Sequence, residues 1–127
     1  MICKKNIFTF IIAGGPLEIH EADEIKKILN DCQIKSISIC DREISDTLEF
    51  LNESKLYIGN DTGFMHLSGC LGVKSFGLFG DSPINYGSYN KHIVPITPKG
   101  VDNIGYNSRM MENINVQHVY DKIKFFL

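Results

Sequence analysis

Apolar and polar positions follow two different periods along this chain. A continuous apolar run over residues 6–13, rich in β-branched and aromatic side chains, predicts a strand buried on both faces. Apolar residues at helical spacing follow from Ala22 to Cys32, with acidic residues early in the segment and lysines later, as the helix dipole favours. The chain therefore begins with a strand followed by a helix.

The same alternation continues towards the C-terminus. Further strands are predicted at residues 35–40, 55–58, 75–79 and 92–97, and helices at 44–51, 62–71 and after Asn115, a good N-cap. Ser45 or Asp46 is the expected cap of the helix at 44–51. Residues 80–91 and 98–113 have no period and are predicted loops. The pattern predicts one α/β domain over residues 1–127, a three-layer Rossmann-like parallel sheet of about five strands.

Composition and charge argue against several classes of protein for this chain. A net charge of −2 gives no basic field for nucleic acid. The four cysteines are scattered without zinc spacing, which favours reduced thiols and a cytoplasmic location. No apolar run approaches the length of a transmembrane segment, and the run after Lys5 favours a buried strand over a signal peptide.

The segment "GNDTG", residues 59–63, joins the third predicted strand to the third predicted helix. Gly59 and Gly63 allow close approach of a ligand to the backbone, and the first amides of the helix suit phosphate oxygens. Thr62 adds a hydroxyl donor, while His66 leans back over the same turn. The alternative is an ordinary helix cap made by Asp61 and Thr62, without a ligand.

A longer segment, "IGNDTGFMHLSGCLGVKSFGLFGDSP" at residues 58–83, resembles the signature of glycosyltransferase family 9, the heptosyltransferases of bacterial lipopolysaccharide synthesis. In that family a strand leads into DTGxxH, a small-residue helix, a Gly-Val pair and an apolar strand ending in Phe-Gly. "FIIAGGPLE" and "ENINVQHVYDKI" resemble flanking parts of the family, so the resemblance covers nearly the whole chain. It implies the C-terminal, donor-binding half of a GT-B architecture.

The resemblance also implies roles for individual residues. Thr62 and Gly63 would hold the donor's diphosphate, Asp61 its sugar, and His66 would line the pocket. Glu18 would contact the sugar or ribose, and Arg42 falls where the base-binding segment runs. The complete implied set is Glu18, Arg42, Gly59, Asp61, Thr62, Gly63, Met65 and His66. The donor would be ADP-heptose or a related nucleotide sugar, with no cofactor and no metal.

Three positions depart from the family pattern. Lys74 stands where proline is usual, and Asp81 and Ser82 replace a common Pro-Thr pair. A carboxylate at this place is expected to weaken binding of a phosphate. The acceptor domain, with the presumed catalytic base, and the βα unit with the family's cationic residue find no match in this chain. We therefore expect a truncated product or fragment that is inactive in isolation.

The implied activity is transfer of a sugar from a nucleotide diphosphate to a lipopolysaccharide-core or other glycan acceptor, in the cytoplasm or at the inner face of the inner membrane. A remnant that only binds nucleotide is the alternative. A receiver-like domain that uses Asp61 as phosphoacceptor would need an acidic pair after the first strand, which "IIAGGP" lacks. A dinucleotide oxidoreductase would need a GxGxxG after a strand, and the sequence has none.

The unmatched βα unit leads to a prediction of strand order. With one central strand missing, closure of the sheet would give the flavodoxin-like order 2-1-3-4-5. Residues 8–12 would then pair with residues 56–58, and Glu18 would lie near Thr62 and His66. A homodimer that lends a strand between copies is the rival outcome.

Overall fold

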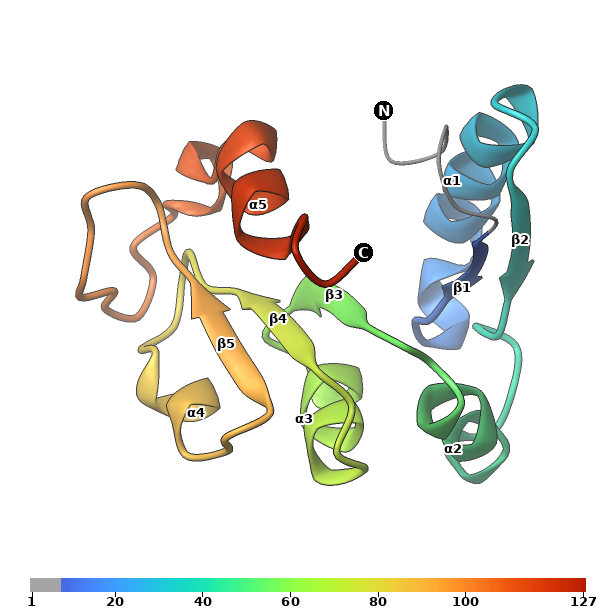
Figure 1. Ribbon diagram of the computed structural model, residues 1–127, viewed down its shortest axis with the longest axis horizontal. Coiled ribbons are helices and arrows are strands. Elements are labelled where there is room, and N and C mark those ends of the chain that lie inside the picture. The colour runs from blue at the N-terminus through green and yellow to red at the C-terminus, as the bar shows by residue number, and fades with distance from the viewer. Residues whose placement is uncertain (1–7) are drawn as a thin grey trace. The chain divides into compact units, whose positions relative to one another are not determined.

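The structure, a computed structural model, describes residues 8–127 of the chain (Figure 1). These residues belong to two compact units, one ending at Phe50 and the other running from Leu51 to Leu127, and each is described by itself. The start of the strand predicted at residues 6–13 lies outside the described residues.

The N-terminal unit is a pair of parallel strands joined by a helix, coloured blue to teal in Figure 1. β1 (Thr9–Ile12) leads through the 3-10 turn η2 (Pro16–Glu18) into α1 (Ile19–Asp31). β2 (Lys35–Ser38) then runs parallel to β1, with Thr9 opposite Lys35 and Ile12 opposite Ser38. α2 (Ile44–Asn52) follows, and the boundary between the units falls within this helix. The unit is thus one βαβ crossover with a helix after it.

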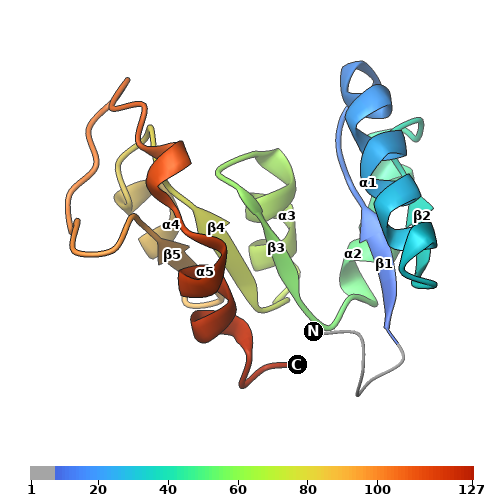
Figure 2. The same cartoon turned by 90° about the horizontal axis from the view of Figure 1, so that it is seen from above.

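The C-terminal unit is a parallel sheet of three strands in the order β3-β4-β5. Its strands are β3 (Tyr57–Asn60), β4 (Ser75–Leu78) and β5 (Ile93–Ile96). Its helices are α3 (Gly63–Cys70), α4 (Asn85–Ser88) and α5 (Val116–Ile123), with the 3-10 turn η3 (Met111–Asn113) before α5. Figures 1 and 2 show α3 and α4 on one face of this sheet and α5 on the other. The unit therefore has three layers.

β4 shows how the two faces of this sheet are filled. Phe76 is buried, and its ring meets Phe126, just beyond α5, edge-on with centroids 5.3 Å apart. Gly77 faces the other side, where the sulfur of Met65 lies so close that a Cβ would collide with it. Met65, Phe79 and Ile93 form the buried cluster beneath α3. Small and large residues therefore alternate along β4 so that α3 lies close against the sheet.

Most predicted elements are confirmed, and three details are corrected. β3 extends to Asn60, two residues past its predicted end, because Gly59 and Asn60 pair with Gly77 and Leu78. α2 begins at Ile44, so Ser45 and Asp46 lie inside the helix and do not cap it. The predicted loop at residues 80–91 contains α4. Asn115 caps α5 as predicted, because its side-chain oxygen accepts a hydrogen bond from the amide of Gln117 at 2.7 Å.

The predicted strand order is confirmed for three of its four neighbour pairs: β1 with β2, β3 with β4, and β4 with β5. In the described part of the chain the strands form a two-stranded and a three-stranded sheet, without a ladder between β1 and β3. The single sheet of five strands is therefore not confirmed and stays a prediction.

Candidate functional site

The candidate site begins at the turn between β3 and α3, at the carboxyl edge of the C-terminal sheet. Thr62 is the N-cap of α3 with extended backbone angles, φ −135° and ψ 172°, but its side chain makes no capping hydrogen bond. Its carbonyl accepts from the amides of Met65 and His66 at 3.0 and 3.3 Å. The amides of Gly63 and Phe64 have no acceptor within the helix, as at every helix start.

The backbone at Gly63 is not covered by other side chains. A Cβ placed on Gly63 would meet no other atom within 4 Å, so this position is open. The turn therefore presents two amides, the positive end of a helix dipole and a hydroxyl that is not used for capping. Such a combination is suited to phosphate oxygens.

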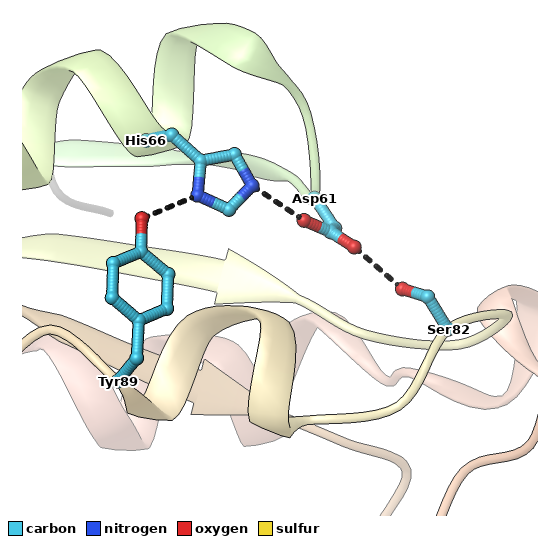
Figure 3. A network of polar contacts seen from close by, with 4 residues as sticks. All are labelled: Asp61, His66, Ser82 and Tyr89. Atoms are coloured by element: carbon cyan, nitrogen blue, oxygen red, sulfur yellow. Dashed lines mark hydrogen bonds and ion pairs between the residues drawn. The ribbon is translucent and has the colours of Figure 1, made fainter.

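A network of four polar side chains lies beside this turn (Figure 3). His66 contacts Asp61 through Nε2 at 3.2 Å and Tyr89 through Nδ1 at 2.8 Å. The hydroxyl of Ser82 donates to the other oxygen of Asp61 at 2.6 Å. Both carboxylate oxygens of Asp61 and both ring nitrogens of His66 are thus engaged.

Four segments of the C-terminal unit bring this network together. Asp61 follows β3 directly, and His66 lies in the first turn of α3, leaning back over the start of the helix. Ser82 lies in the loop after β4, the strand next to β3, and Tyr89 follows α4. Because parallel strands end at the same edge of a sheet, residues 21 positions apart in sequence meet there.

Two further tyrosines of the C-terminal unit lie against each other. The hydroxyl of Tyr86 hydrogen-bonds to that of Tyr106, and their rings meet edge-on with centroids 6.0 Å apart. The hydrogen bond with Tyr86 raises the pKa of Tyr106 above the ordinary tyrosine value. The phenol of Tyr106 therefore stays neutral at physiological pH.

The other predicted site residues of the C-terminal unit have structural roles. Met65 is 0% exposed and packs in the core, so in this structure it offers no surface to a ligand. The ring of Tyr57 lies over Gly59, with its Cζ 2.9 Å from where a Cβ would be, so that glycine makes room for a side chain of its own strand.

Glu18 and Arg42 belong to the N-terminal unit. The carboxylate of Glu18 accepts from the amide of Gly15 at 2.6 Å, and the guanidinium of Arg42 lies 4.9 Å from the centre of the Phe50 ring. Both side chains thus have local partners within their own unit. Their expected place beside Thr62 and His66 stays a prediction.

The three departures noted in the sequence also acquire local roles. The Lys74 ammonium lies 5.3 Å from the centre of the Phe126 ring. Asp81 accepts a hydrogen bond from the backbone amide of Arg109 at 2.6 Å, so its carboxylate holds the loop after β5. Ser82 supports Asp61. The Asp-Ser pair thus serves the site's own structure.

A family model described as glycosyltransferase family 9 (heptosyltransferase) matches residues 2–113. The chain belongs to glycosyltransferase family 9. The searches of curated proteins and of solved structures gave no match. The resemblance expected from residues 58–83 is thereby confirmed, and the α/β fold with parallel strands agrees with a Rossmann-like glycosyltransferase domain.

Two further observations concern this family 9 chain. In residues 8–127, no group of three or more His, Cys, Asp or Glu side chains is arranged to hold a metal ion. Over the same residues, none of the helices has the length and apolar character needed to cross a bilayer.

Ser82 and Tyr89 are site residues that the sequence analysis did not propose. Ser82 was noted only as a departure from the family pattern, and its neighbour Asp81 drew attention as a charge. Tyr89 lies in the stretch predicted as a loop, where periodicity gives no information on side-chain direction. The sequence held one indication for Ser82: it is a hydroxyl residue in the loop that follows a predicted strand, and parallel strands end at the same edge of the sheet.

Proposed function

We propose that the C-terminal unit, residues 51–127, binds the nucleoside diphosphate part of a nucleotide sugar at the β3–α3 turn. The observation that carries this proposal is the open helix start at Gly63 beside the unused hydroxyl of Thr62, in a chain that belongs to glycosyltransferase family 9. By the family resemblance the donor is ADP-heptose or a related nucleotide sugar. Its acceptor is a lipopolysaccharide-core or other glycan hydroxyl.

The chemistry of such a site is stabilisation of a leaving group. When an acceptor hydroxyl attacks the anomeric carbon, the bond to the diphosphate breaks and negative charge grows on its oxygens. The amides of Gly63 and Phe64 and the dipole of α3 would stabilise that charge without reorganisation. Asp61 and His66 would face the sugar from the neighbouring network.

A role in binding alone is the second candidate. Asp61 and His66 are held to each other, to Ser82 and to Tyr89 by hydrogen bonds, which suits a role in orienting a bound group. The family resemblance places the presumed base in an acceptor domain that these 127 residues do not match. We therefore expect the isolated chain to bind the donor without transferring the sugar.

Calorimetry with ADP and ADP-heptose tests the proposed site. Thr62→Ala removes the hydroxyl and is expected to lower affinity about threefold to tenfold, the value of one hydrogen bond. Thr62→Ser keeps the hydroxyl and should bind like the natural chain. His20→Ala removes an exposed histidine of α1 and is the matched control for His66→Ala. Equal affinities for Thr62→Ala, His66→Ala and the natural chain would place the nucleotide elsewhere.

A further inference from the structure

Tyr89 is the member of the site that none of the sequence motifs accounts for. It follows α4 and is 62% exposed, yet its hydroxyl lies 2.8 Å from Nδ1 of His66. Its ring also stacks beside the imidazole, with centroids 5.9 Å apart and planes 19° from parallel. Two separate interactions therefore hold Tyr89 against His66.

For a neutral His66 ring, the hydrogen bonds of the network determine where each proton lies. An ionised carboxylate only accepts hydrogen bonds, so the nitrogen of His66 that faces Asp61, Nε2, carries a proton. A neutral imidazole has one protonated nitrogen, which makes Nδ1 an acceptor. The hydroxyl of Tyr89 then donates to Nδ1 (Figure 3). The Tyr89 hydroxyl thus donates to His66, and His66 and Ser82 both donate to the Asp61 carboxylate.

We propose that Tyr89 is a positioning residue of the donor site, which holds the His66 imidazole in the Nε2–H tautomer with Nδ1 as an acceptor. Asp61 fixes one side of the ring and Tyr89 the other, so rotation about the bond to the ring would break both contacts. The proton placement rests on the network alone. The consequence for ligand binding rests on the proposed function.

This arrangement leaves neither ring nitrogen of His66 to a phosphate oxygen. Nε2 faces Asp61 and Nδ1 faces Tyr89. A phosphate oxygen has no proton to donate to Nδ1. A ligand that reaches the partly exposed His66 side chain therefore meets an imidazole of fixed orientation, and the phosphates are left to the amides of α3.

Tyr86, on α4, provides a matched control. It lies three residues before Tyr89, and its hydroxyl bonds to Tyr106 and takes no part in the hydrogen bonds of His66 described above. Tyr86→Phe and Tyr89→Phe therefore remove the same kind of atom from neighbouring positions, and only Tyr89→Phe removes it from the network.

The proton placement is tested by nitrogen NMR of the histidine rings at about pH 8, where histidine is ordinarily neutral. Loss of a signal set in His66→Ala identifies its ring among the four histidines of the chain. We expect a proton on Nε2, and an Nδ1 signal that moves towards that of a free acceptor in Tyr89→Phe but stays in place in Tyr86→Phe. A proton on Nδ1, or an Nδ1 signal unchanged by Tyr89→Phe, would overturn the assignment.

The positioning role is tested by affinity for ADP-heptose. Tyr89→Phe should bind about threefold to tenfold more weakly, the value of one neutral hydrogen bond, and Tyr86→Phe within about twofold of the natural chain. Equal affinity of the natural chain and Tyr89→Phe would refute the positioning role. If the natural chain itself binds no nucleotide sugar, the proposed function fails, and the NMR measurement alone decides the tautomer.

Discussion

At the scale of single residues, the site is built from groups that satisfy one another. Asp61 lies next to a helix start suited to anions, where an uncompensated carboxylate would repel a phosphate. His66 and Ser82 each donate to one of its oxygens, which holds the carboxylate in place. The carboxylate thereby orients the imidazole.

The Tyr86–Tyr106 pair leads to a prediction on pH. The hydrogen bond with Tyr86 raises the pKa of Tyr106 in the folded state. The contact therefore stabilises the fold below the ordinary tyrosine pKa of about 10, and this contribution is lost as the pH rises through the folded value. Spectrophotometric titration should show one tyrosine ionising later than the others. Tyr86→Phe should remove the late step, and a late step that survives would assign it to another residue.

A motif directed attention to part of the candidate site. Asp61, Thr62, Gly63 and His66 were proposed from their spacing and the family resemblance; they lie at the β3–α3 turn, and their roles in donor binding stay predictions. Ser82 and Tyr89 were not proposed, because their contacts depend on which strand ends and loops meet in space. Met65 was also proposed, and in the structure it packs in the core.

At the scale of elements, α3 links the core to the site. Its start presents Gly63 and His66, and one residue, Met65, anchors it against Phe79 and Ile93. The packing of Met65 in the core sets the distance between the start of α3 and the sheet. Packing in the core therefore determines the geometry of the ligand turn.

Shortening Met65 tests this link. Met65→Ala should lower the free energy of unfolding by about 2–5 kcal/mol, because it leaves a cavity in a fully buried cluster. Met65→Leu keeps most of the volume and should cost less than about 1.5 kcal/mol. Urea unfolding followed by circular dichroism measures both. Near-equal stability of the alanine variant and the natural chain would show that Met65 does not anchor α3.

Sequence periodicity predicted the longer helices and the strands and missed α4. α4 has only four residues, "NYGS", too few to show a period. α4 packs closely on the core, because a Cβ on Gly87 would come within 2.8 Å of Phe79 and 3.0 Å of Ile93. Tertiary packing of this kind cannot be deduced from local spacing. Tyr89 follows α4, so its place in the site could not be predicted either.

At the scale of the whole molecule, family membership and the local pairing of strands are established. The family match spans both units, and the pairs β1–β2, β3–β4 and β4–β5 follow the predicted neighbours. The DTGxxH turn and its supporting loops all lie within the C-terminal unit. The proposed diphosphate turn and its supporting network are therefore residues of that unit.

The most direct test of donor binding is an amide NMR titration of the chain with ADP-heptose. We predict saturable shifts centred on the amides of Gly63 and Phe64, with smaller shifts at Asp61 and His66, because the first two amides would bind the diphosphate. ADP should reproduce the shifts at Gly63 and Phe64, and Thr62→Ala should require more ligand to reach saturation. Saturable shifts that leave residues 59–66 unaffected, or no saturable shift at all, would contradict the account.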